Sequence, residues 1–166
     1  MNERLTHVDD AGRARMVDTS SKNVTLRSAT ARGSVTCSDE AMRQVRANSV
    51  TKGNVIEVAR LAGIMAAKRT PDLIPLCHPL PLRHVDVLID ADSTEGSILI
   101  EATARVEAAT GVEMEALTAV AVAGLTIIDM IKAIDRWARI ADVALVSKEG
   151  GKSGLQRRED AQAPEG

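Results

Sequence analysis

Residues Thr110–Arg136 read TGVEMEALTAVAVAGLTIIDMIKAIDR, and this stretch sets how the rest of the chain must fold. Small and aliphatic side chains fill most of its positions, so a helix here is apolar nearly all round and is expected to lie buried. Four charged residues interrupt the pattern: Glu113, Glu115, Asp129 and Lys132. Burying such groups costs free energy unless they are paired, hydrogen-bonded or chemically useful. The stretch therefore indicates a core helix that also carries candidate catalytic groups.

Patterns on either side of this helix predict four strands and two more helical segments. Alternating or β-branched runs predict strands at 23–36, 85–90, 98–106 and 140–146, and helical spacing predicts helices at 38–48 and 55–68. In chain order the elements are strand, helix in two parts, strand, strand, helix, strand. This is the split β-α-β order, and it predicts an α+β, ferredoxin-like fold in which helices cover one face of an antiparallel sheet.

The length of 166 residues suits one domain with a proper core and is short for two. Residues 1–22 are polar and lack a sustained period, so we interpret them as an N-terminal segment that can be flexible. Residues 23–155 are predicted to form a single ferredoxin-like catalytic domain, and residues 156–166 a disordered C-terminal tail.

Composition narrows the classes of function. The net charge of −2 argues against a nucleic-acid binder, because such proteins usually present a basic face. Trp137 is the only aromatic residue, so stacking of bases on aromatic side chains is largely excluded. The chain shows no signal-peptide pattern and charges interrupt its long apolar runs, so no membrane association is expected. Cys37 and Cys77 make no disulfide framework, which favours a reducing cytoplasm.

Asp129 and Lys132 are one helical turn apart, about 4.5 Å along the axis, so they can share a pocket as a general acid and base. The alternative is an exposed ion pair, which would stabilise the helix by about 0.2–0.5 kcal/mol. The apolar neighbours Ile128 and Ile131 keep both interpretations open.

Glu113 and Glu115 are two residues apart and are expected to point to different sides of the helix. Carboxylates at a helix N-terminus also simply complement its dipole. Along a straight helix Glu115 lies about 21 Å and Glu113 about 24 Å from Asp129, whereas a small-molecule pocket is only about 10 Å across. If all these groups serve catalysis, a neighbouring subunit has to bring one set to the other. The spacing therefore predicts an oligomer with sites at its interfaces.

The segment PDLIPLCHPLPL, residues 71–82, holds four of the five prolines. Proline lacks a backbone N–H and restricts the preceding residue, so we predict a rigid, non-helical loop that packs inward. Such a loop can hold His78 ready for a ligand, although a lone histidine is more often structural. Cys77 is interpreted as a small buried hydrophobe, and no Cys or His spacing supports a metal site.

Basic residues gather at three places: Lys52 with Lys68 and Arg69, Arg27 on the first predicted strand, and Lys148 with Lys152 in KEGGKSG. The KEGGKSG stretch combines ammonium groups with glycines that expose backbone N–H groups, which suits a phosphate-rich ligand. The P-loop pattern is absent, and surface lysines are commonly just a solvated face.

Four separated motifs resemble the cyclic pyranopterin monophosphate synthases of molybdenum cofactor biosynthesis. They are LTHVDDAGRARMVD, KGNVIEVARLAGIMAAKRTPDLIPLCHPLPL, TGVEMEALTAVAVAGLTIIDMIKAID and KEGGKSG, and the similarity runs from about Leu5 to Gly154. The resemblance implies a ferredoxin-like subunit in a homohexamer built as a trimer of dimers. It also implies a lyase that converts (8S)-3′,8-cyclo-7,8-dihydroguanosine 5′-triphosphate into cyclic pyranopterin monophosphate and releases diphosphate.

By the same resemblance, Asp129 and Lys132 would be the catalytic pair. Substrate would contact the loop and the start of the long helix, with cations on the triphosphate: Leu76, Cys77, His78, Glu113, Met114, Glu115, Lys52, Lys148 and Arg27. No redox cofactor, pyridoxal phosphate or iron–sulfur cluster is implied, and Mg²⁺ on the triphosphate would leave no dedicated motif.

The chain departs from the family pattern at three places. Asn54 stands where Asp usually follows Lys-Gly, Ile128 where Tyr is usual, and Ala108-Ala109 where Gly-Lys is frequent. Ile128 cannot make a hydrogen bond that the usual tyrosine would make, and Ala108-Ala109 lacks the cation that the frequent lysine would place near the phosphates.

Two other classes of function compete with the lyase. A nucleotide-binding regulatory module would bind GTP analogues without turnover, since fold alone does not fix function. In a structural oligomerisation subunit, the charges of the long helix would be interface salt bridges, and Leu at both Asp129 and Lys132 would be tolerated.

Overall fold

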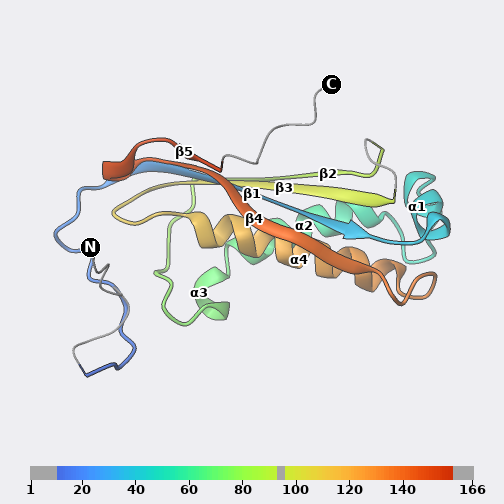
Figure 1. Cartoon of the computed structure of the whole chain (residues 1–166), viewed down its shortest axis with the longest axis horizontal. Helices are drawn as coiled ribbons and strands as arrows, with labels where there is room; N and C mark the ends of the chain where they lie inside the picture. The colour runs from blue at the N-terminus through green and yellow to red at the C-terminus, as the bar shows by residue number, and fades with distance from the viewer. Residues whose placement is uncertain (1–10, 93–95, 159–166) are drawn as a thin grey trace.

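One antiparallel sheet of five strands, in the order β2-β3-β1-β4-β5, organises the chain (Figure 1). The computed structural model describes residues 11–92 and 96–158. The strands are β1 (Thr25–Thr36), β2 (His84–Asp90), β3 (Ser97–Ala108), β4 (Arg139–Glu149) and β5 (Gln156–Arg157). The helices are α1 (Asp39–Arg46), α2 (Val55–Ala67), α3 (Thr70–Leu73), α4 (Glu113–Ile131) and a 3₁₀ turn η1 (Gly151–Ser153).

The two longest strands, β1 and β3, form the centre of the sheet. They pair along their whole length, with Thr25 opposite Ala108 and Thr36 opposite Ser97. Residues on one face alternate with those on the other, and the inner positions are small or β-branched, such as Ala31 and Ile98. On the outer face, the hydroxyls of Thr30 and Thr103 are hydrogen-bonded at 2.9 Å. The sheet therefore has one apolar and one polar face.

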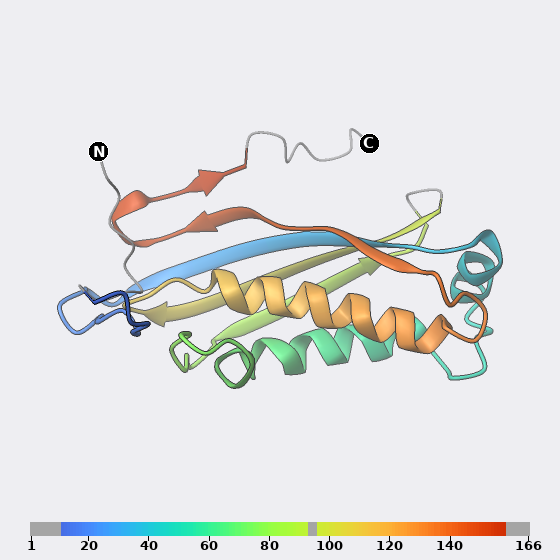
Figure 2. The same cartoon turned by 60° about the horizontal axis from the view of Figure 1, so that its bottom comes forward.

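Helices α2 and α4 lie side by side beneath the apolar face, as Figure 2 shows. Gly63 of α2 permits their close approach: a Cβ there would stand 3.0 Å from the carbonyl oxygen of Ala119 in α4 and 3.2 Å from Val87. The core between helices and sheet consists mainly of aliphatic side chains, with Val120, Ile127 and Ile131 of α4 fully buried. The predicted ferredoxin-like α+β fold, with its element order and helix-covered face, is confirmed.

Helix α4 is shorter than the apolar run that predicted it. It begins at Glu113 and ends at Ile131, where the N–H groups of Ile134 and Asp135 both bond to the Ile131 carbonyl and close the helix in a turn. By length and mean hydropathy (1.8) α4 could cross a membrane, although its charged ends led us to expect otherwise. Because α4 packs against α2 and the sheet, a core position accounts for the same composition.

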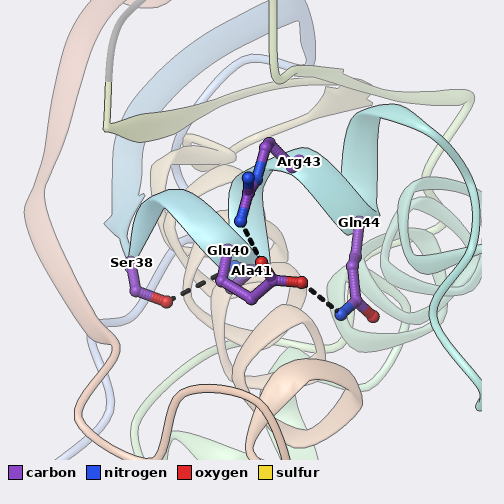
Figure 3. A network of polar contacts seen from close by, with 5 residues as sticks. All are labelled: Ser38, Glu40, Ala41, Arg43 and Gln44. Atoms are coloured by element: carbon purple, nitrogen blue, oxygen red, sulfur yellow. Dashed lines mark hydrogen bonds and ion pairs between the residues drawn. The ribbon is translucent and has the colours of Figure 1, made fainter.

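Helix α1 is capped as its sequence predicts. The Ser38 hydroxyl accepts a hydrogen bond from the Ala41 N–H at 3.4 Å, and Glu40 accepts from Gln44 at 2.7 Å and from Arg43 (Figure 3). The Asp135 carboxylate accepts from the Ser38 N–H at 2.7 Å. This last contact ties the start of α1 to the turn that follows α4.

Two segments differ from the prediction. The proline-rich loop opens with a single helical turn, α3, because proline is tolerated in the first turn of a helix and Pro71 stands there. The Thr70 hydroxyl donates to the Ala67 carbonyl at 3.1 Å and joins this turn to α2. At the C-terminus, Gln156–Arg157 pairs with β4 as strand β5, so the tail is not disordered from residue 156. Residues 159–166 lie outside the described residues.

Gly63→Val tests the helix contact. We expect it to lower the free energy of unfolding by about 1–3 kcal/mol, because the added carbons overlap a backbone carbonyl that cannot move away. Urea denaturation followed by circular dichroism measures the change. Ala62→Val is the matched control, since Ala62 is partly exposed on the same helix and the change adds a comparable side chain at mainly the propensity cost. Equal stabilities for the two variants would contradict the close packing.

Candidate functional site

The proline-rich loop and the start of α4 enclose a cavity of about 500 Å³, here called the Cys77 cavity. Its lining comprises Val17, Lys22, Leu76, Cys77, His78, Leu80, Thr110, Gly111, Glu113, Met114, Glu115 and Lys148. Three loop residues and three helix residues that the sequence singled out therefore meet, together with Lys148 from β4. The predicted inward packing is confirmed only in part: Leu80 and Leu82 pack against the core, whereas Leu73 is exposed.

Both glutamates of the helix start face this one cavity, so the expectation that they point to different sides is wrong. Glu113 is the first residue of α4 and its carboxyl group folds back over Gly111, filling the space that a Cβ there would need. Its Oε1 accepts a hydrogen bond from Lys148 Nζ at 3.0 Å. Glu115 lies two residues further along the helix and is only 3% exposed. The side-chain conformation of Glu113 therefore decides which cavity its carboxyl group reaches, and the helical spacing alone does not.

Burial gives two groups of the Cys77 cavity unusual acidities. Loss of water raises the pKa of Glu115, and the negative charge of Glu113 adds to the effect. Burial also raises the pKa of the Cys77 thiol, with a contribution from the Glu115 charge. Cys77 therefore stays protonated at neutral pH and is a poor nucleophile. Cys77 was expected to be a small buried hydrophobe, and the structure places it in a half-buried position.

A second and larger cavity, about 750 Å³, adjoins the first and is called the Arg27 cavity. The two share Lys22, Thr110 and Gly111 in their linings, and Lys152 adds another cation to the second. Arg27 is fixed there by the carbonyls of Ala108 and Ala109, which accept its Nε and Nη2 hydrogens at 3.0 and 3.2 Å. The Arg27 cavity is thus basic and suited to anionic groups.

The KEGGKSG stretch wraps around Arg27 through glycines in left-handed conformations. Gly150 and Gly151 have φ of +109° and +69°, and a Cβ at Gly151 would stand 2.7 Å from Arg27 Nη1. Only glycine gives both that conformation and that approach at low cost. The sequence predicted this stretch as a phosphate contact, and the structure brings it beside Arg27.

A separate group of charges lies at the other end of α4. Asp129 Oδ1 accepts from Lys132 Nζ at 2.7 Å, and Oδ2 accepts from Lys52 Nζ at 2.9 Å. Lys52 also donates to the Asp129 carbonyl oxygen at 2.6 Å, satisfying an end group of the helix. The hydrogen bonds from Lys132 and Lys52 lower the pKa of Asp129 to about 2. Asp129 is therefore a carboxylate at every physiological pH.

The expected buried setting of the Asp129–Lys132 pair is not found in the single chain. The two side chains are 57% and 58% exposed. The helix ends at Ile131, so Lys132 projects beyond the core while Asp129 occupies the outer side of the last turn. Lys52 lies at this end of α4 and does not line the Arg27 cavity, although the family resemblance implied that it binds the triphosphate together with Arg27 and Lys148.

Helix α4 separates the two groups as its length predicts. From Glu115 to Asp129 the axis runs for about 21 Å. Figure 2 shows α3 and the loop that follows it beside the start of α4, whereas the turn into β4 lies at the opposite end of this helix. One chain alone does not place Lys132 beside His78.

Comparison with known proteins agrees with these features. The profile of the MoaC family matches residues 16–151, which include every candidate site residue except Lys152. The chain belongs to the MoaC family.

Three members of the family, each a cyclic pyranopterin monophosphate synthase, illustrate the similarity. The protein of Parvibaculum lavamentivorans is 57% identical over 152 residues, which cover 92% of this chain and 95% of that one. That of Roseiflexus sp. is 57% identical over 150 residues, covering 90% and 95%. That of Thermomicrobium roseum is 54% identical over 159 residues, covering 96% of both.

Sequence reasoning missed Val17 and Lys22, which line the Cys77 cavity from the N-terminal segment. We had set residues 1–22 aside as polar and without a period. One signal for Val17 was present in the sequence: the motif LTHVDDAGRARMVD, which resembles the family, includes this residue. A segment that served only as a linker would have no reason to carry such a motif. Residues 1–10 lie outside the described residues.

The Asp129 ion pairs predict a specific titration. Replacing Lys132 with Met removes the cation at 2.7 Å, so the pKa of Asp129 should rise from about 2 towards 3.8. Because the folded pKa is the lower one, the associated stability is present above pH 3.8 and is lost as the pH falls towards 2. Carbon-13 NMR of the Asp129 carboxyl group measures the shift. Lys68→Met should leave it unchanged, and titration near 3.8 in the unaltered protein would contradict the geometry.

Proposed function

We propose that this chain catalyses the reaction for which its relatives are named, as a lyase of molybdenum cofactor biosynthesis. The substrate would be (8S)-3′,8-cyclo-7,8-dihydroguanosine 5′-triphosphate, and the products cyclic pyranopterin monophosphate and diphosphate. The observation that carries the proposal is the meeting of Leu76, Cys77 and His78 with Glu113–Glu115 in one cavity, next to a basic one. A ring system and a triphosphate need such neighbouring sites.

The two cavities divide the substrate between them. The Cys77 cavity offers a buried carboxyl group, Glu115, and a rigid loop, which suit the hydrogen-bonding edge of a purine-derived ring. The Arg27 cavity offers Arg27, Lys22 and Lys152 to the phosphates. Closing a cyclic phosphate expels diphosphate, and its developing charge is stabilised by cations that are already in place.

Proton transfer is assigned to Lys132, with Asp129 as its orienting partner. A carboxylate whose pKa is about 2 has no proton to give at neutral pH, so the ammonium group is the donor. Lys52 holds the other oxygen of Asp129 and leaves this end of α4 with a net positive charge. A Lys132 ammonium group held in one orientation would accelerate both the ring rearrangement and the closure of the cyclic phosphate.

A second protomer would bring Lys132 to the Cys77 cavity. Val122 stands midway between Glu115 and Asp129 on α4, so a two-fold axis near it would place Asp129 of one protomer over Glu115 of the other. Apolar residues exposed on the helix layer suit such a contact: Val58, Leu61, Met65 and Leu125. Three such dimers would form the homohexamer, with active sites at the interfaces.

The proposal includes a cytoplasmic location, consistent with two free cysteines. It includes no resident cofactor and no protein metal site, with Mg²⁺ allowed only as a companion of the triphosphate. It also involves neither nucleic acid nor membrane as a partner.

Direct turnover tests the activity. Purified protein incubated with the cyclised dihydro-GTP should release diphosphate and form the tricyclic pterin, both followed by chromatography. Lys132→Ala should lower kcat by about 100-fold or more, because a positioned acid is lost. Lys68→Ala is the matched control, as Lys68 is exposed at the end of α2. A fully active Lys132→Ala enzyme would refute the assignment of Lys132.

Mixed oligomers test the shared site. Lys132→Ala and His78→Ala proteins, each inactive alone, are unfolded, mixed in equal amounts and refolded. If each site takes Lys132 from one protomer and His78 from its neighbour, random pairing restores about a quarter of the wild-type activity. No recovery, with assembly verified by light scattering, would mean that both groups serve the same protomer's site.

A further inference from the structure

We infer that the Glu113 carboxylate is a displaceable occupant of the anion position at Lys148. Substrate phosphate takes its place on binding, and its return to Lys148 helps to expel diphosphate. The inference rests on the proposed function and gives Glu113 a role beyond lining the site: it sets how tightly the phosphates are held and released.

The first support is where the carboxylate stands. Glu113 Oε1 accepts a hydrogen bond from Lys148 Nζ at 3.0 Å. The same carboxyl group lies over Gly111, where an added Cβ would stand 2.6 Å from Glu113 Cδ. Gly111 lines both the Cys77 and the Arg27 cavities. The negative charge of Glu113 therefore lies at the boundary between the Cys77 cavity and the Arg27 cavity, which a substrate that fills both cavities must cross.

The second support is a contrast between two cations. Arg27 is held by two backbone carbonyls, which are neutral, so it keeps its full charge for a ligand. Lys148 is instead neutralised by a carboxylate. A phosphate that approaches Lys148 meets this carboxylate first, and two anions on one ammonium repel each other. Binding therefore requires Glu113 to turn away.

The third support is that the pair can open. The Lys148 and Glu113 side chains are 37% and 28% exposed, and ion pairs accessible to water are weak. Glu113 is the first residue of α4, so its side chain turns without disturbing the helix. Glu115, at 3% exposure, has no such freedom.

Calorimetry with inorganic diphosphate tests the inference in the full-length protein. Glu113→Gln should bind diphosphate about fivefold more tightly, because the competing charge is gone while the shape is kept. The same variant should show a lower inhibition constant for diphosphate in the turnover assay. The matched control is Glu149→Gln, which makes the same change of charge on the exposed residue next to Lys148. It should alter binding by less than about twofold, since water and salt screen its charge.

The double variant separates displacement from a general charge effect. Lys148→Ala alone should weaken diphosphate binding, and in that background Glu113→Gln should bring almost no gain. The inference is overturned if Glu113→Gln binds diphosphate no more tightly than wild type, if Glu149→Gln gains equally, or if the gain persists without Lys148. Failure of the proposed function looks different: Lys148→Ala would then leave diphosphate binding unchanged and the protein would not turn over the cyclised triphosphate.

Discussion

The contact between α4 and the centre of the sheet constrains the rest of the molecule. Two glycines allow the helix to approach the sheet closely. A Cβ at Gly33 of β1 would stand 2.8 Å from Val120 of α4, and a Cβ at Gly124 of α4 would stand 3.1 Å from Ile140 of β4. With the helix pressed so tightly, its middle has no room for charge. The charged side chains of α4 are confined to its two ends, Glu113 and Glu115 at the start and Asp129 near the finish. The length of α4 thereby fixes the distance between the two groups of candidate site residues, and this distance is the reason why the proposed reaction includes a second protomer.

The fold could be predicted because its signals are local and periodic. Alternation along β1 and β3, capping at Ser38 and the glycine turns each act within a few residues, and the structure agrees with them. The site was only partly predictable for the opposite reason. The carboxyl group of Glu113 reaches the same cavity as that of Glu115 because it folds back over Gly111, a choice of side-chain conformation that helical spacing does not contain. Lys52 meets Asp129 across 77 residues of sequence, and no local pattern encodes that contact.

Two of the three departures from the family pattern have a structural account. Asn54 caps α2 by accepting the Glu57 N–H at 3.1 Å, which an aspartate would do equally well. Ala108 and Ala109 present carbonyls, not side chains, to Arg27, so that contact does not depend on which residues stand there. Ile128 is partly buried and packs against the core, and the structure gives no account of this departure.

The exposure of Asp129 and Lys132 changes what the pair can do alone. In water the attraction between the Lys132 ammonium and the Asp129 carboxylate is weak, and exposure to water does not favour proton transfer from either group. Covering this end with another subunit would remove water from three charges at once, and a net positive charge would remain because Lys52 and Lys132 share one carboxylate. Removing water strengthens the attraction of that charge for an anion more than it strengthens any contact to a neutral ring. The Asp129 end would therefore become an efficient catalytic group only after assembly and in the presence of an anionic substrate, which links the oligomer, the phosphates and the proton donor in one physical requirement.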